Sequence, residues 1–324
     1  MKAIVQNAYG STEVFKHKEV EKPEVKDNDV LVRVYAAAAN AGDYFSMRGS
    51  PWLARMSVGF PKPRDYIPGW DFAGRVEQVG KEVGRFQPGD EVYGASTHTF
   101  AEFVSAEAGS LAPKPDNLTF EQAAAVPTAA LTALQGLRDK GQVQKGQKVL
   151  INGASGGVGT FSVQIARYYE AEVTGVCSTK KVDMVHSIGA DHVVDYTQED
   201  FATGGRRYDL ILDNVASRSF SDLRRSLSAR GLIIPNSGHS GMRYVIKAYL
   251  LSAFTRQLTS PWMMSVNHKD LVFIKDLIEA GKLTPVIDRI YPLSQAPEAI
   301  GYLGDGHPCG KVVINVVQND RKEG

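Results

Sequence analysis

The sequence predicts an α/β protein in which a small, irregular β-barrel precedes a parallel sheet that carries helices on both faces. Short β-branched runs separated by frequent Gly and Pro fill the first hundred residues. After residue 113, apolar strands alternate with helical patterns, which is typical of a doubly wound sheet. A chain of 324 residues is also too long for one small core, which favours two domains.

The expected barrel strands are interrupted by turns. Residues 30–34 form a β-branched run after a turn, residues 72–80 alternate between polar and apolar, and residues 86–94 lead through a turn into another strand. The Pro-Lys-Pro-Asp stretch at 113–116 is a rigid connector, and residues 310–316 form a strand again. We therefore expect one domain over 1–120, completed by 267–324, and a second over 121–266.

The second domain is expected to contain a series of short apolar strands, at residues 148–152, 172–176, 192–195, 208–213 and 231–235. A helix follows the first strand, because apolar side chains recur at helical spacing at Val158, Phe161, Ile165 and Tyr168. Near the C-terminus, Asn267 is placed to cap a helix that ends at Gly281.

Composition excludes several classes of protein. Lys and Arg number 37 and Asp and Glu number 36, so the net charge of +1 lacks the basic excess of a nucleic-acid binder. Cys177 and Cys309 lie too far apart for a disulfide framework or a Cys-x-x-Cys metal clamp, which fits a reducing compartment. No signal-peptide pattern and no apolar run near the ~20 residues that span a bilayer is present. We expect a soluble, cytoplasmic protein.

A glycine-rich loop follows the strand at 148–152 and opens the next helix. A phosphate group needs backbone N–H donors that no Cβ obstructs, and a helix N-terminus supplies them. The strand–turn–helix context predicts a dinucleotide site rather than an ordinary glycine-rich turn. The loop residues expected to bind the cofactor are Gly153, Ser155, Gly156, Gly157 and Val158.

The end of the next strand indicates which nucleotide binds. NAD sites usually place an acid there for the ribose 2′-hydroxyl, about 20 residues after the loop. This turn instead carries Ser178, Lys180 and Lys181, and Tyr196 follows the third strand. Hydroxyls and cations suit a 2′-phosphate, so NADPH is the expected cofactor. The alternative is that the two lysines only face solvent at a helix N-terminus.

Several motifs resemble the medium-chain dehydrogenase/reductase superfamily, in particular its zinc-independent quinone oxidoreductase branch. They extend over nearly the whole chain, at residues 40–43, 68–74, 124–130, 153–159, 213–215 and 310–314. The resemblance implies a GroES-like catalytic domain, a Rossmann domain for the cofactor, and an active site between them.

The resemblance also assigns individual residues. It implies that Asn40, Asp43 and Phe45 line the nicotinamide and substrate pocket, although relatives often carry Tyr at the Phe45 position. For Asp43, a local turn or cap is nearly as good an interpretation. The resemblance places four further residues along the cofactor, namely Thr128, Asn214, Ser237 and Gly238.

The expected reaction needs no metal. Zinc-dependent relatives hold the metal with a Cys near residues 40–43 and a His near Trp70, and this sequence has neither. Without a Lewis acid, the acceptor must take hydride readily, as quinones and α,β-unsaturated carbonyls do. A second hypothesis is an NADPH-binding protein with a structural or interaction role. A zinc-dependent alcohol dehydrogenase is disfavoured.

Residues 241–262 depart from the minimal family pattern. They predict a helix that is apolar nearly all round at 249–254 and must therefore be covered. The first interpretation is that it packs beside the protein's cleft as a wall or lid. A lipid surface is the minority alternative. Residues 262–266 resemble a sixth Rossmann strand, and by resemblance that edge pairs with a second subunit to form a homodimer.

Overall fold

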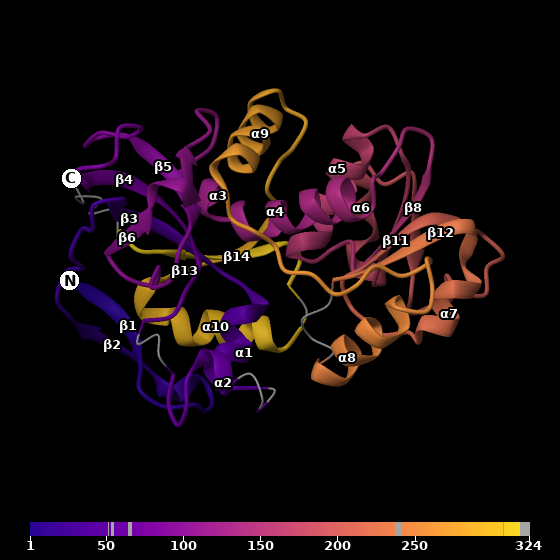
Figure 1. Ribbon diagram of the computed structural model, residues 1–324, viewed down its shortest axis with the longest axis horizontal. Helices are drawn as coiled ribbons and strands as arrows, with labels where there is room; N and C mark the ends of the chain where they lie inside the picture. The colour runs from indigo at the N-terminus through magenta and orange to yellow at the C-terminus, as the bar shows by residue number, and fades with distance from the viewer. Residues whose placement is uncertain (51, 53–54, 64–66, 237–240, 307, 318–324) are drawn as a thin grey trace. The chain divides into compact units, whose positions relative to one another are not determined.

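The chain forms two compact units, and each has the kind of sheet expected from the sequence (Figure 1). Unit 1 comprises Met1–Thr128, Val266–Gly281 and Ile287–Gly324, and unit 2 comprises Ala129–Ser265 and Lys282–Val286. This computed structural model describes residues 1–50, 52, 55–63, 67–236, 241–306 and 308–317. The α/β fold class is confirmed.

Unit 1 is built on a mainly antiparallel sheet of order β13-β14-β3-β4-β5-β7, in which β6 also pairs with β3. Its strands are β3 (Asp29–Ala39), β4 (Asp71–Val79), β5 (Glu91–Ala95), β6 (Phe103–Glu107), β7 (Leu111–Pro113), β13 (Ile287–Pro292) and β14 (Lys311–Asn315), and a separate pair is formed by β1 (Lys2–Gln6) and β2 (Phe15–Glu19). Its helices are α1 (Ala41–Arg48), α2 (Arg55–Val58), α3 (Phe120–Ala124), α9 (His268–Glu279) and α10 (Ala296–Gly304). Because β14 pairs with β3, the end of the chain completes a sheet that begins near its start.

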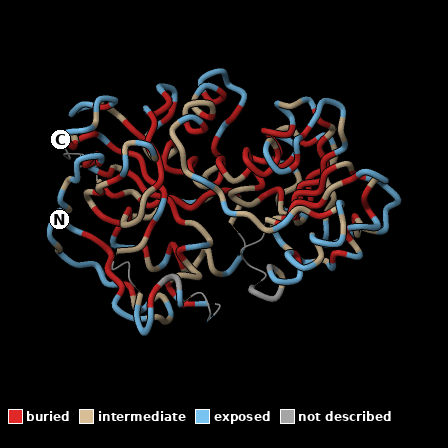
Figure 2. The backbone as a smooth tube through the Cα atoms, in the orientation of Figure 1, coloured by how far each residue is buried: buried red, intermediate tan, exposed pale blue. Residues whose placement is uncertain are grey.

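Unit 2 is a parallel sheet of order β10-β9-β8-β11-β12. Its strands are β8 (Lys148–Asn152), β9 (Glu172–Cys177), β10 (His192–Asp195), β11 (Tyr208–Asp213) and β12 (Leu227–Pro235). Its helices are α4 (Pro127–Gln135, which begins in unit 1), a π-helical turn (Gly136–Lys140), α5 (Gly157–Tyr168), α6 (Val182–Ser187), α7 (Phe220–Arg225) and α8 (Gly241–Ser252). The order reverses between β8 and β11, the point at which such sheets bind ligands beyond their carboxyl ends. The strands of this sheet are mostly buried (Figure 2).

Local sequence signals predict several of these elements closely. The runs 148–152, 192–195 and 208–213 become β8, β10 and β11 with the same bounds. Helix α9 begins after Asn267, whose side chain accepts a hydrogen bond from the Asp270 N–H at 2.8 Å. Gly281, just beyond the helix, has the positive φ of 66° that favours glycine at a helix end.

The expected sixth strand at 262–266 is wrong. This segment forms no strand, and the backbone of Ser265 exchanges two hydrogen bonds with the Gln135 side chain, at 2.7 and 2.9 Å. The edge of β12 instead forms a single parallel bridge from Ile233 to Leu258. Pro261, which has no N–H to donate to a ladder, precedes the segment. The predicted dimer contact through a strand at 262–266 therefore lacks its structural basis.

The helix expected over 241–262 is shorter than predicted. It ends at Ser252, after about three turns. Turns follow within residues 253–257, and the chain then lies beside β12, where the Thr259 N–H donates to the Ile233 oxygen. Within the part of the chain that the structure describes, no helix has both the length and the apolar character needed to cross a bilayer.

Candidate active site

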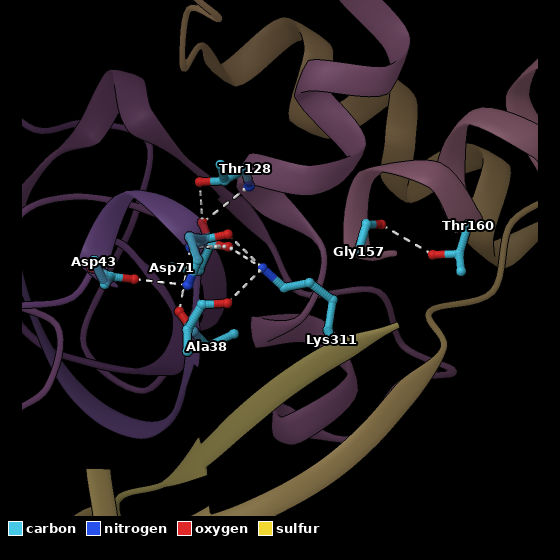
Figure 3. Close-up of polar contacts among 9 residues, drawn as sticks. Ala38, Asp43, Asp71, Thr128, Gly157, Thr160 and Lys311 are labelled. Carbon is cyan, nitrogen blue, oxygen red and sulfur yellow. Dashed lines mark hydrogen bonds and ion pairs between the residues drawn. The ribbon is translucent and has the colours of Figure 1, made fainter. Parts of the chain in front are cut away.

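The glycine loop lies where β8 ends and α5 begins. Gly156 is the residue before the helix, and no side chain caps the N-terminus of α5. Two hydrogen bonds within the first turn stabilise it. The Thr160 N–H donates to the Gly156 oxygen at 2.9 Å, and the Thr160 hydroxyl donates to the Gly157 oxygen at 3.0 Å (Figure 3). Gly157 and Val158 form this turn, and the buried Ser155 precedes it. The uncapped end of a 12-residue helix leaves N–H donors available for a phosphate.

Two glycines of the loop have different roles. A Cβ on Gly159 would lie 2.0 Å from the Gly153 oxygen, so helix and loop approach too closely for a side chain. A Cβ on Gly156 would make only an ordinary contact, at 3.5 Å from the same oxygen. Packing within the protein therefore does not require a glycine at position 156. A bound diphosphate would require one, because it would occupy the space that a side chain would fill. Gly153 has a φ of 76°, which starts the loop's turn.

Gly159→Ala should lower the free energy of unfolding by about 1–3 kcal/mol, because the added methyl group forces backbone apart. Gly204→Ala is the control in the same unit, since its nearest contact would be 4.0 Å away. Urea denaturation of the two variants measures the difference. Equal losses would show that the loop does not constrain Gly159.

The residues expected at the 2′-phosphate gather at the carboxyl ends of β9 and β10. The Tyr196 N–H donates to the Cys177 oxygen at 3.0 Å, which brings Tyr196 beside the half-buried Ser178. The Lys181 N–H bonds the Ser178 oxygen at 2.9 Å in the short helix that follows, and the Lys180 side chain is exposed. The backbone of the chain thus brings two hydroxyl-bearing residues and two lysines to the carboxyl end of the sheet.

Sequence reasoning missed Asp195, the last residue of β10. It pairs in register with Cys177, and its carboxylate therefore lies close to the β9 turn. Hydrogen bonds from Thr179, Thr197 and Gln198 hold its pKa below the ordinary value, the Thr179 hydroxyl contributing most. The two oxygens accept four such bonds, at 2.5 to 3.0 Å. A carboxylate has about four acceptor positions. Asp195 therefore has little capacity left for a ribose hydroxyl.

The switch point of the sheet carries a connected set of polar groups. The Asn214 side chain donates to the Asn152 oxygen at 3.1 Å and accepts from Asn236 at 2.7 Å. The Asn152 amide donates to the fully buried Asp213 at 2.8 Å. These hydrogen bonds link the carboxyl ends of β8, β11 and β12. No role was predicted for Asn236 from the sequence. Ser237 and Gly238, the next predicted residues, lie outside the described residues.

Unit 1 contains a buried ionic network around two of the predicted residues (Figure 3). The Lys311 ammonium lies 3.1 Å from the Asp71 carboxylate and 2.6 Å from Asn40 Oδ1, and it also bonds the Ala39 oxygen. The second Asp71 oxygen accepts from the Thr128 N–H at 3.0 Å and from its hydroxyl at 2.5 Å. The structure thus joins Asn40 and Thr128 through a buried Lys–Asp pair that sequence reasoning missed.

Asp43 lies beside this network and caps α1. Its Oδ2 accepts from the Asn40 N–H at 2.8 Å, so the alternative interpretation as a local cap describes its contacts. Its Oδ1 is buried and has no hydrogen-bond partner among the described residues. Burial, with a smaller contribution from the Asp71 charge, raises the Asp43 pKa from 3.8 to about 7, against the opposing Asn40 N–H. The group can therefore gain or lose a proton near neutral pH.

The aromatic residues of α1 have separate environments. The Phe45 ring is half-buried and contacts Tyr44 edge-on, with centroids 5.7 Å apart. The Tyr44 hydroxyl accepts from Arg48 at 3.1 Å, and its ring packs against Gly304 of α10. Tyr44 is therefore engaged in packing α1 on α10.

The donor set of the described residues does not fit a metal. No three His, Cys, Asp or Glu side chains gather there closely enough to hold an ion. Asp71, the carboxylate deepest in the network, already faces a lysine ammonium.

Comparison with known proteins accounts for both units. Residues 26–136 match the model of the alcohol dehydrogenase GroES-like domain, and residues 188–314 match a model described as zinc-binding dehydrogenase. The chain is 30% identical to the quinone oxidoreductase from Coxiella burnetii, with a TM-score of 0.88 over 98% of this chain and 99% of that one. These matches confirm the expected combination of a GroES-like domain with a Rossmann-type sheet.

Two curated relatives match nearly the whole chain. The chloroplastic quinone-oxidoreductase homolog of Spinacia oleracea is 31% identical over 97% of this chain and 98% of its own length. The chloroplastic NADPH-dependent alkenal/one oxidoreductase of Arabidopsis thaliana is 31% identical over 97% of this chain and 79% of its own length. The chain is therefore an NAD(P)H-dependent oxidoreductase, and it belongs to the quinone oxidoreductase branch of the medium-chain dehydrogenase/reductase superfamily.

Proposed function

We propose that the protein binds NADPH in preference to NADH and reduces a quinone or an α,β-unsaturated carbonyl without a metal ion. One observation carries the choice of nucleotide. Backbone contacts bring Ser178, Lys181 and Tyr196 close to one another at the carboxyl ends of β9 and β10, while the carboxylate of the neighbouring Asp195 already accepts four hydrogen bonds. A 2′-phosphate finds donors and positive charge here, whereas a 2′-hydroxyl finds no available carboxylate.

Each part of the nucleotide has residues that suit it. The N–H groups of Gly156, Gly157 and Val158 at the uncapped end of α5 would hold the diphosphate. The hydroxyls of Ser178 and Tyr196, with Lys181 and the exposed Lys180, would hold the 2′-phosphate. We assign Thr128, Asn214, Ser237 and Gly238 to the nicotinamide half. The NADPH dependence of the Arabidopsis relative, as its name states, supports this choice.

Lys181→Ala tests the nucleotide assignment. Loss of one charge-assisted contact should weaken NADPH binding by about 1.5–3 kcal/mol, or roughly 10- to 150-fold, and leave NADH binding nearly unchanged. Nucleotide fluorescence titrations of wild type and variant measure both affinities. Lys145→Ala is the control, because Lys145 is an exposed lysine of the same unit that pairs with Glu170. Equal weakening of both nucleotides by Lys181→Ala would refute the 2′-phosphate assignment.

We propose an acceptor that can be reduced without a metal, and the lack of a suitable group of metal ligands among the described residues supports this choice. NADPH supplies a hydride, and without a Lewis acid the acceptor must delocalise the charge it gains onto an oxygen. Quinones and α,β-unsaturated carbonyls do so. The printed names of the relatives support both classes, since one is a quinone oxidoreductase homolog and another an alkenal/one oxidoreductase.

The reduced acceptor also takes up one proton, and we assign Asp43 to its supply. Its pKa of about 7 keeps the carboxyl partly protonated at neutral pH. The Asn40 N–H holds one oxygen, which leaves Oδ1 as the proton-bearing atom. Asn40 positions Asp43 and is in turn held by Lys311. Phe45, two residues further along α1, offers an apolar ring and no proton.

A further inference from the structure

Helix α8 is apolar on two opposite faces, and only one of them packs on its own unit. On the inner face, Ala248 is fully buried, and Tyr244 and Leu251 pack on the core of the parallel sheet. The Tyr244 ring stacks on Phe220 with centroids 4.9 Å apart. Its hydroxyl donates to Asp213 at 3.0 Å, and burial beside that carboxylate raises the Tyr244 pKa. These contacts hold the helix in one rotation about its axis.

That rotation turns a second apolar stripe outward. Ile246, Tyr249 and Leu250 have the i, i+3, i+4 spacing of one helix face, and more than half of each side chain is exposed. Phe254, in the turn after the helix, is 88% exposed, and its N–H bonds the Leu251 oxygen at 3.0 Å. We call these four residues the α8 apolar face (α8 is labelled in Figure 1, and Figure 2 shows burial in the same view).

The stretch of sequence that contains this face is rich in basic residues. Between Asp222 and Asp270 the sequence contains no acidic residue, whereas it contains seven basic ones, Arg224, Arg225, Arg230, Arg243, Lys247, Arg256 and Lys269. Over the whole chain the net charge is only +1, so this segment concentrates positive charge. Lys247 and Arg256 are exposed, and within the described residues neither forms an ion pair.

We propose that the α8 apolar face, with Lys247 and Arg256, is a docking surface for an anionic lipid bilayer. Aliphatic and aromatic side chains on a helix that lies in the membrane plane enter the boundary between headgroups and acyl chains, and neighbouring basic groups bind lipid phosphates. A second copy of the chain fits this surface less well. A twofold contact would place the same basic segment opposite itself, and like charges would repel. The inference does not depend on the proposed reaction.

Vesicle co-sedimentation of the full chain tests this surface. The protein should sediment with vesicles of phosphatidylcholine mixed with phosphatidylglycerol, bind less to phosphatidylcholine alone, and dissociate as salt is raised. No sedimentation with either vesicle would overturn the proposal. Equal, salt-independent binding to both would overturn the assigned role of the basic residues.

Matched variants locate the surface. Leu250→Ala should weaken binding by roughly tenfold through lost apolar burial, and Lys247→Gln by about fivefold through lost charge. Ile246→Ala should also weaken binding, whereas Ile290→Ala should not, although the two isoleucines are 51% and 53% exposed. Lys16→Gln, at an exposed lysine of β2, is the charge control. All variants should keep the unfolding transition of the wild type, because each replaced side chain is exposed.

Sedimentation velocity tests whether a second copy of the chain, rather than a bilayer, covers the α8 apolar face. Suppose that the wild type is a dimer that does not bind vesicles, and that the Leu250→Ala and Ile246→Ala variants are monomers. The face is then a contact between copies, and the lipid proposal is wrong. Control variants that bind vesicles as weakly as the α8 variants would show that another surface carries the binding.

Discussion

Lys311→Met is expected to destabilise the protein by about 3–5 kcal/mol, because the substitution leaves a buried carboxylate without its counter-charge. Asp71 is completely buried, and Lys311 supplies the cation of its network. Thr128 and Asn40 would still donate hydrogen bonds, but neither neutralises the charge. Urea denaturation with a probe in unit 1 measures the loss.

Two further variants make this result specific. Lys81 and Asp27 form an exposed pair with an N–O distance of 3.0 Å, close to the 3.1 Å of Lys311 and Asp71. Lys81→Met should therefore cost under about 1 kcal/mol. Adding Asp71→Asn to Lys311→Met should recover part of the stability, since it removes the stranded charge. Equal costs for the two lysines, or no recovery in the double variant, would contradict this description of the network.

Asp43→Asn is expected to remove a pH dependence of stability of roughly 4 kcal/mol. The folded carboxyl has a pKa of about 7, and the unfolded one a pKa near 3.8. Below pH 4 both states carry the proton, so the group has no net effect. Between pH 4 and 7 only the folded state keeps the proton, so wild-type stability falls as pH rises. Above pH 7 the loss is complete.

The measurement is the free energy of unfolding of wild type and Asp43→Asn between pH 4 and pH 8. The amide keeps an oxygen that can accept from the Asn40 N–H, so the cap of α1 is retained. The stability of the variant relative to wild type should therefore rise with pH. Parallel curves would mean that Asp43 has an ordinary pKa in the folded protein.

Much of the fold can be predicted from the sequence, because the signals that define these elements lie within a few residues of them. The apolar run of β8, the glycines that follow it and the cap at Asn267 each lie within a few residues of the structure they specify. The same holds for the expected phosphate loop and for the turn at Ser178. Their roles in binding the cofactor stay predictions.

The features that sequence reasoning missed depend on contacts between distant residues. Lys311 lies in an apolar strand whose sequence gives no sign of a partner, and Asp71 is 240 positions away. They meet because β14 and β4 flank β3, which places Val312 opposite Ala39 and Asp71 opposite Ala38. Asp195 likewise reaches the β9 turn only through the pairing of β10 with β9.

The error at 262–266 has a similar cause. A short apolar segment predicts a strand, but a strand also needs a neighbouring backbone to pair with. The Gln135 side chain satisfies both backbone groups of Ser265 instead. For α8, the sequence predicted a helix that is apolar nearly all round, while the exposure of its outer face depends on Tyr244 and Ala248 filling the space over the sheet.

NADPH oxidation at 340 nm, with NADH in parallel, against a paired set of quinones and 2-alkenals is the decisive measurement. We expect turnover with NADPH that clearly exceeds turnover with NADH, at an unchanged rate after treatment with a metal chelator. Turnover of quinones alone would assign the acceptor to that class, and turnover of alkenals alone to the other. Tight NADPH binding without oxidation by any acceptor, or activity that the chelator abolishes, would contradict the proposed metal-free reductase.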